Sequence, residues 1–271
     1  MSKLNRDREG VAHTSVTYVL LLCAGLPPLN CAELTPAARQ AFSRYVGLFE
    51  TTWRQSPMGL EKSRARAGET VIQPRKNVDG GQEIRPPGAM IQDWRGVMFL
   101  ANAQIEQVRA MMQDYNNYQV YFKPEVTRAK VIRRQGDDFE VFLRLYKKHI
   151  LTVVLNTNYA IKYVSTDPRH MQVISRSTRI TEVKNAGEAS ESEEMPGHDS
   201  GYLWALNSYW RFEEADSGVY AECEAISLSR DAPLGLGWVL KGFLDKFPKE
   251  SMHSTLESVK RAVVARASGG H

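Results

Sequence analysis

Residues 237–267 read GWVLKGFLDKFPKESMHSTLESVKRAVVARA and predict one long amphipathic helix that closes a chain rich in strand patterns. The apolar side chains of its second half recur at spacings of four, three and four, which places them on one helical stripe: Met252, Leu256, Val259 and Val263. Pro248 between the two halves lacks a backbone donor, so we expect a bend or a restart there. Such a helix needs a large apolar surface to lie on.

The middle of the chain predicts the strands that supply this surface. Apolar residues occupy alternate positions at Phe139, Val141, Leu143 and Leu145, and residues 151–163 continue the same period of two. Residues 202–212 repeat the pattern and are expected to place one set on a common side: Tyr202, Trp204, Leu206, Trp210 and Phe212. We therefore expect strands that each bury one face.

The order of these patterns predicts the fold class. Thr35 and Pro36 suit the start of a helix over residues 36–54, and a Gly-, Pro- and charge-rich connector with one short strand at 69–73 follows. From residue 90 a strand, a helix and a succession of strands lead to the closing helix. We predict an α+β fold, in which a curved antiparallel sheet of about six to seven strands wraps around the C-terminal helix, with an additional N-terminal helix.

The same order of patterns predicts the domain organisation. Residues 33–87 hold the N-terminal helix and the extended connector, and residues 88–267 form the sheet domain. Within it, residues 187–200 (GEASESEEMPGHDS) are acidic and poor in aliphatic side chains, so we expect a mobile loop.

The first residues resemble a secretory signal. Lys3, Arg6 and Arg8 precede an apolar run over residues 16–26, which falls short of the roughly 20 residues of a membrane-spanning helix. We expect residues 1–32 to be a signal peptide that directs the protein to the periplasm or outside the cell, with cleavage after Ala32 or, alternatively, after residue 24 or 25. A mis-assigned start or a short uncleaved anchor remains the alternative. Cleavage after Ala32 would leave Cys223 as the sole cysteine and exclude an intramolecular disulfide.

Composition and motifs exclude several function classes. The net charge of +4 is spread over 271 residues without an Arg- and Lys-rich run, which argues against nucleic-acid binding. The six histidines fall outside metal-ligand spacings, and the catalytic and phosphate-binding motifs of common enzymes do not occur. We expect no metal and no cofactor. We expect Cys223 to be a small, buried apolar residue.

Two stretches resemble the START-like, helix-grip domains of the SRPBCC superfamily. In residues 96–145, the step FLANA ends a first strand, a helix follows, and the turn KPEV leads into the next strand. Residues 227–247 (SLSRDAPLGLGWVLKGFLDKF) are similar to the last strand, proline-bearing turn and closing helix of the coenzyme Q-binding and polyketide cyclase branches. The resemblance covers residues 88–267 and leaves out residues 33–87.

The resemblance implies a hydrophobic cavity between the sheet and the closing helix. Family members hold lipids, sterols, polyketides, quinones or plant hormones there, and some branches catalyse cyclisation. Because ligand cavities are lined mainly by apolar and aromatic groups, our candidate ligand-binding residues are Leu155, Tyr159, Trp204, Leu206, Trp238 and Phe243. The Tyr159 hydroxyl is a candidate hydrogen-bond donor to a ligand oxygen. The alternative is a core tyrosine whose hydroxyl donates to a backbone carbonyl.

The charged strand residues allow two interpretations. Arg144, Arg176 and Arg179 alternate with Glu222 and Glu224 on other strands, which favours ion pairs on the convex face of the sheet. The alternative is a buried arginine that binds a ligand carboxylate.

Three functions compete at this point. The leading hypothesis is an exported protein that binds a lipid or another hydrophobic small molecule, with transient membrane contact and without chemistry of its own. The second is a cyclase or aromatase in which a cavity tyrosine, arginine or glutamate directs proton transfer. The third is an interaction module, whose sign would be an exposed apolar stripe at Phe42, Phe49 and Trp53. Otherwise, the N-terminal helix packs on the domain's own surface.

Overall fold

The computed structural model describes residues 32–58, 61–148, 152–231 and 237–268, and within the last range it describes the side chains of 247–266 only. The predicted signal segment lies outside the described residues, except for Ala32. Ala32–His271 form one compact unit, so the N-terminal helix and its connector belong to the same unit as the sheet.

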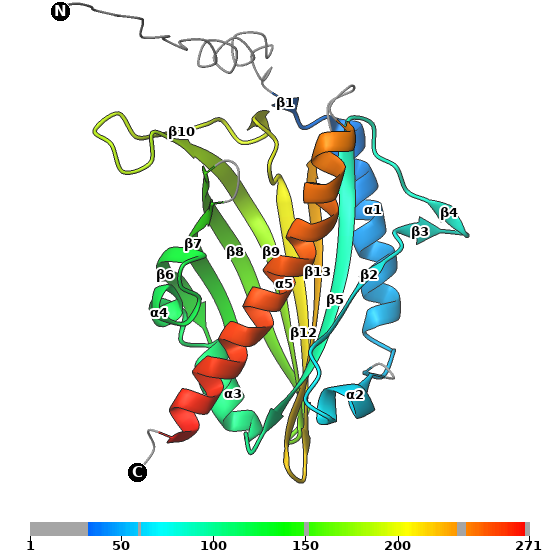
Figure 1. The fold of residues 1–271 in the computed structure, drawn as a ribbon, viewed down its shortest axis with the longest axis vertical. Helices are drawn as coiled ribbons and strands as arrows, with labels where there is room; N and C mark the ends of the chain where they lie inside the picture. Colours follow the sequence, from blue (N-terminus) through cyan, green and yellow to red (C-terminus); the bar gives the residue numbers. More distant parts are fainter. Residues whose placement is uncertain (1–31, 59–60, 149–151, 232–236, 269–271) are drawn as a thin grey trace, which may run out of the picture. The chain divides into compact units, whose positions relative to one another are not determined.

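The unit is built on a nine-stranded antiparallel sheet (Figure 1). Its order is β2 (Val71–Arg75), β5 (Ala89–Ala101), β13 (Gly218–Arg230), β12 (Ala205–Ala215), β9 (His170–Lys184), β8 (Thr152–Asp167), β7 (Asp138–Lys148) and β6 (Val126–Gln135), and β10 (Ser192–Glu193) pairs with β9. The α+β helix-grip arrangement is confirmed, with more strands than the predicted six to seven. The extra edge strand β2 comes from the connector, close to the short strand predicted at 69–73.

Shorter elements complete the chain. The helices are α2 (Lys62–Arg66), α3 (Ile105–Met112), the 3-10 turn η1 (Tyr115–Asn117) and α4 (Tyr118–Tyr121). The short strands are β1 (Ala32–Glu33), which pairs with β11 (His198–Asp199), and β3 (Val78–Asp79), which pairs with β4 (Gln82–Glu83).

The closing helix α5 (Gly237–Ser268) crosses one face of the sheet, which we call the inner face (Figure 1). The four side chains of the predicted stripe are at most 4% exposed and pack with Met98, Val141, Phe212 and other inner-face residues. The helix continues past Pro248 without a restart. The apolar surface that this helix requires is therefore the inner face.

The N-terminal helix α1 (Pro36–Trp53) covers the opposite, outer face. Thr35 caps it as predicted, because its hydroxyl accepts a hydrogen bond of 3.1 Å from the Ala38 amide. Its stripe of Phe42, Tyr45, Phe49 and Trp53 is buried against sheet residues that include Ile174, Tyr209 and Ile226. The stripe that would mark an interaction module is thus buried on the domain's own surface.

Ion pairs and the short strand β10 connect the acidic segment 187–200 to the sheet. Arg144 forms two hydrogen bonds of 2.8 Å with the Glu191 carboxylate, and Arg179 pairs with Glu193 on β10. The Arg144 guanidinium is the main cause that lowers the pKa of Glu191 to about 2. These arginines therefore form ion pairs as expected, but their partners are in this segment and not on β13.

At Gly96, the side chains of α5 pack closely against the backbone of β5. A Cβ atom at this position would lie 2.5 Å from Leu256 Cδ1 and 3.1 Å from Met252 Cγ, both on side chains that are themselves buried. The substitution Gly96→Val should therefore lower the free energy of unfolding by about 1–3 kcal/mol, measured by denaturant titration. Gly47→Val, in the exposed part of α1 with no atom within 4 Å, is the matched control. Equal stability of the two variants would contradict this packing.

Candidate functional site

The inner face has two halves, one toward each end of the strands. Where α3 and the second half of α5 meet the sheet, the space is filled by side chains that are at most 1% exposed: Met98, Leu100, Val108, Met111, Val141, Phe212, Leu256 and Val259. This packed half leaves no room for a ligand.

The other half lies toward the end of the sheet at which α5 begins (Figure 1). We call it the ligand half, defined by five half-buried inner-face residues: Trp94, Leu143, Leu145, Leu206 and Ala225. Strand pairing sets Ser208 between Ala225 and Ser175, and Ser227 beside Leu206. Apolar walls with a few hydroxyl groups are the usual surface of a small-molecule pocket.

Three of the predicted site residues belong to the inner face. Leu155 is buried and pairs with Leu145, and Tyr159 is buried within the inner core. Leu206 is half-buried, and strand alternation places it on the same side as Trp210. Trp238 and Phe243 lie on α5, but their side chains are outside the described residues.

Trp204 lies on the other side of the sheet, which corrects the expectation that it shares a face with Leu206. It packs in the outer core, and its indole Nε1 donates a hydrogen bond of 2.9 Å to Asp199. The reason is local, because β12 begins at Ala205 and the preceding Gly201 has φ of 77°, in the left-handed region. The alternation of the strand therefore does not extend back to Trp204.

Tyr159 is a hydrogen-bonding group and not a base. Burial raises its pKa to about 12, against a smaller opposite effect of its hydrogen bond with Thr157. The Thr157 hydroxyl in turn donates 2.8 Å to the Leu143 carbonyl. The phenol thus stays protonated at neutral pH.

A hollow of about 200 Å³ opens where the end of β7 faces α5. It is lined by Pro124, Glu125, Tyr146, Lys147, Lys148, Phe247, Glu250 and Ser251. Lys147 Nζ lies 3.4 Å from Glu125 Oε1 and 5.7 Å from the centre of the Phe247 ring. Lys147 was not among the predicted site residues, although it takes the next inward position on β7 after Phe139, Val141, Leu143 and Leu145.

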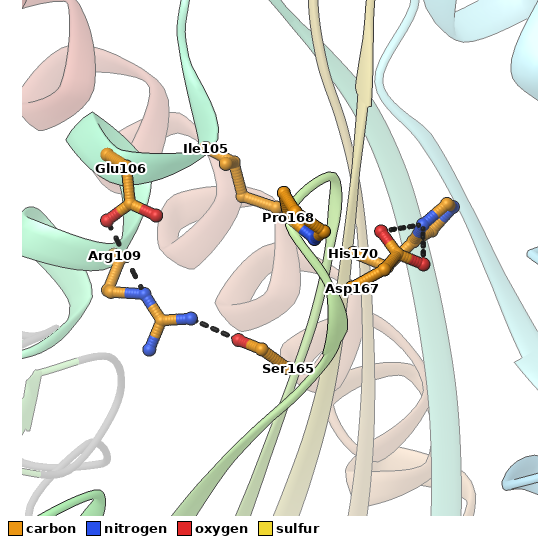
Figure 2. A pocket seen from close by; sticks show the side chains of 7 residues that line it. All are labelled: Ile105, Glu106, Arg109, Ser165, Asp167, Pro168 and His170. Atoms are coloured by element: carbon orange, nitrogen blue, oxygen red, sulfur yellow. Dashed lines mark hydrogen bonds and ion pairs between the residues drawn. The ribbon is translucent and has the colours of Figure 1, made fainter.

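A second hollow of about 200 Å³ lies between α3 and the turn from β8 to β9. Figure 2 shows Ser165 directed at Arg109, and His170 directed at Asp167. His170 Nδ1 is 2.8 Å from Asp167, and the imidazole is exposed at the first position of β9. Because the serine and the histidine each face another partner, they do not form a nucleophile–base pair.

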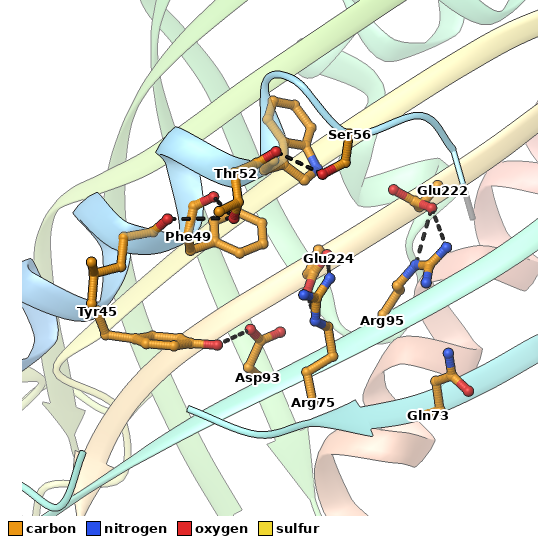
Figure 3. Close-up of polar contacts among 12 residues, drawn as sticks. Tyr45, Phe49, Thr52, Ser56, Gln73, Arg75, Asp93, Arg95, Glu222 and Glu224 are labelled. Atoms are coloured by element: carbon orange, nitrogen blue, oxygen red, sulfur yellow. Dashed lines mark hydrogen bonds and ion pairs between the residues drawn. The ribbon is translucent and has the colours of Figure 1, made fainter. Parts of the chain in front are cut away.

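A buried polar cluster lies between α1 and the sheet (Figure 3). The Tyr45 hydroxyl donates to Asp93, which also shares a hydrogen bond with Glu224. Arg75 Nε lies 3.0 Å from Glu224. Burial is the main cause that raises the pKa of Glu224 to about 9, and Asp93 adds to it. Glu224 is therefore protonated at neutral pH and can donate to Asp93.

The surrounding arginines tie the cluster to both helix and strands. Arg95 forms hydrogen bonds of 3.0 and 2.6 Å with Glu222, and Arg176 bonds Glu50 of α1 at 2.8 and 2.7 Å. Arg211 donates to the Trp53 carbonyl. Strongly shifted carboxyl groups also occur at active sites, but Asp93 and Glu224 are buried beneath α1, and the cluster anchors this helix.

Two features of other protein classes are absent from the described residues. No group of three or more His, Cys, Asp or Glu side chains in this part of the chain is placed to hold a metal ion. None of the described helices has the length and apolar character that a membrane crossing needs.

No protein-family model and no curated protein matches the chain. The Zhui aromatase/cyclase from Streptomyces sp. R1128 is similar in structure, with a TM-score of 0.47 and 11% identity over 66% of this chain and 96% of that one. The STAR-related lipid transfer protein fragment from Xanthomonas axonopodis has a TM-score of 0.43 and 14% identity over 71% and 98% of the two chains. Human STARD10 has a TM-score of 0.43 and 9% identity, over 78% of this chain and 82% of that one.

START-like proteins and aromatase/cyclases are thus among the structures that this chain resembles, as its sequence predicted. The likeness concerns the arrangement of elements. At these scores and identities it carries no conclusion about ligand or activity.

The acid pair beneath α1 predicts a pH-dependent stability. In the unfolded chain Glu224 loses its proton near the ordinary pKa of about 4.3, whereas in the folded chain it keeps the proton up to about pH 9. The contribution of Glu224 to the free energy of unfolding is therefore fully present below the unfolded pKa and decreases as pH rises above it, by up to about 1.4 kcal/mol per pH unit. Glu224→Gln, which keeps a donor toward Asp93, should flatten this slope between about pH 5 and pH 8.

The measurement is the free energy of unfolding by urea titration at several pH values. Glu106→Gln, on a side chain that is 76% exposed, serves as the control. An unchanged slope in Glu224→Gln would show that Glu224 does not carry the pH dependence.

Proposed function

We propose that the chain binds a lipid or another hydrophobic small molecule between the inner face of the sheet and α5. The observation that carries the proposal is the contrast between the two halves of the inner face. One half is filled by its own side chains, whereas Leu143, Leu145 and Leu206 of the ligand half stay half-buried in the folded chain. Covering such apolar surface is favourable by about 25 cal/mol per Å², which supports an apolar ligand there.

Binding without chemistry is favoured over a cyclase or aromatase. Tyr159 remains protonated at neutral pH, and burial raises the pKa of Cys223 well above its ordinary value. A general base or a thiolate nucleophile needs the opposite shift. The protonated state of these two inner-face groups therefore favours a role in holding a ligand over a role in catalysis.

The proposal includes export to the periplasm or beyond, with transient membrane contact when ligand is exchanged. It rests on the basic residues and short apolar run within residues 1–32. The intact mass of the protein recovered from the periplasm or culture fluid tests it. A mass that corresponds to a chain starting at residue 33 supports export with cleavage after Ala32. A mass that corresponds to a start at residue 25 or 26 supports the alternative cleavage. Recovery of the full-length mass from the cytoplasm alone contradicts export.

The first test of binding is native mass spectrometry of protein purified from its host without detergent. We expect a reproducible added mass that organic solvent releases and that is identified as a lipid or a similar apolar compound. A clean unliganded mass, with no uptake from a host lipid extract, would contradict the proposal.

A pair of variants ties binding to the ligand half. Leu206→Glu places a charge on the half-buried inner face and should weaken uptake of the identified compound about tenfold or more, because the charge must be desolvated. Ile132→Glu makes the same change on β6 at a side chain that is 51% exposed and should leave uptake unchanged. Equal uptake by both variants would place the ligand elsewhere.

A further inference from the structure

Lys147 is the last inward-facing residue of β7. The preceding inward positions, Phe139, Val141, Leu143 and Leu145, belong to the inner core or pack against it. Lys147 pairs with Val153 on β8 and has a side chain that is 30% exposed. An ammonium group at the end of an apolar stripe is costly to desolvate unless acceptors surround it.

Among the described residues, few acceptors surround Lys147. Its hydrogen bond to Glu125 Oε1 measures 3.4 Å, whereas charge-assisted hydrogen bonds are usually about 2.7–2.9 Å. The same oxygen accepts a shorter bond of 2.6 Å from Ser254. Burial is the main cause that lowers the pKa of Lys147, against the opposite effects of Glu125 and Glu250. An ammonium has three donors, so this site has capacity for a further acceptor.

The hollow of about 200 Å³ lies directly beside this ammonium. It sits between Pro124 and Glu125 on one side and Phe247 and Glu250 of α5 on the other. Its charged lining residues are Lys147, Lys148, Glu125 and Glu250. On β7, the inward position before Lys147 is Leu145, which begins the apolar stripe of the ligand half. A ligand that fits both parts has one small anionic group and one apolar chain.

We propose that this hollow binds the carboxylate of a single-chain amphiphile, with Lys147 as its counter-ion and the apolar chain lying over Leu145 and Leu143. The inference rests on the proposed binding of a hydrophobic ligand and names the chemistry of its polar end. Glu125 competes with the ligand carboxylate for Lys147, so binding weakens the contact between Lys147 and Glu125.

The test compares palmitic acid with hexadecanol, which has a chain of the same length and no charge. Binding to the delipidated full chain is measured by isothermal titration calorimetry at about pH 8. Lys147→Met keeps the apolar stem and removes the donors, so the affinity for palmitate should fall about tenfold or more, whereas hexadecanol should be little affected. Lys130→Met, at an exposed position of β6 outside this hollow, should leave both affinities unchanged.

Glu125→Gln should change the affinity for palmitate in the opposite direction. It removes the competing carboxylate and keeps an acceptor for Ser254, so palmitate should bind several-fold more tightly. Circular dichroism checks that each variant is folded, and Glu125→Gln alone still decides the question if Lys147→Met does not fold. An unchanged or weaker affinity in Glu125→Gln contradicts the proposal.

The outcomes separate this inference from the proposed function. Equal binding of palmitate and hexadecanol by the wild-type chain, or the same preference in Lys147→Met, would overturn the role of Lys147 while leaving the hydrophobic-ligand site in place. No binding of either amphiphile would overturn this inference, whereas the proposed function is decided by the native mass spectrometry described above.

Discussion

The structure depends on the burial of one sheet on both of its faces. Because α5 covers the inner face and α1 the outer, successive residues of the central strands enter two different cores: on β12, Tyr209 packs under α1, and Trp210 packs toward α5. Polar side chains on these strands cannot turn to water, so each must find a partner inside the protein. The pairing of Arg95 with Glu222 and the shared proton of Asp93 and Glu224 follow from this constraint.

The same constraint explains how much of the fold could be predicted. The period of two on β7 and β8 and the spacing of Met252, Leu256 and Val259 are local patterns, and each correctly predicted an element and its buried side. The docking of α1 depends on contacts between residues more than a hundred positions apart, such as Arg176 with Glu50. Sequence periodicity shows that a helix has an apolar stripe but not which surface covers it.

The candidate site was predictable to a similar extent. Alternation correctly placed Leu155, Tyr159 and Leu206 on the inner face because they lie within regular strands. It misplaced Trp204, because the turn at Gly201 precedes the strand. Lys147 went unnoticed because a lysine that ends an apolar stripe resembles the solvated end of a strand until its burial is known. The ion-pair partners of Arg144 and Arg179 depended on the path of segment 187–200, which no local pattern determines.

The described sheet remains open, with β2 and β6 as its two edges, and this has a consequence for self-association. An exposed edge offers unpaired amides and carbonyls to a strand of another molecule. On β2, Pro74 lacks the amide that such a strand would need. On β6, two register shifts break the edge, four basic residues lie along it (Arg128, Lys130, Arg133 and Arg134), and the Asn116 side chain accepts a hydrogen bond of 2.9 Å from the Val131 amide. Both edges thus resist the growth of intermolecular β-sheet, so a sheet this wide can stay uncapped without seeding aggregates.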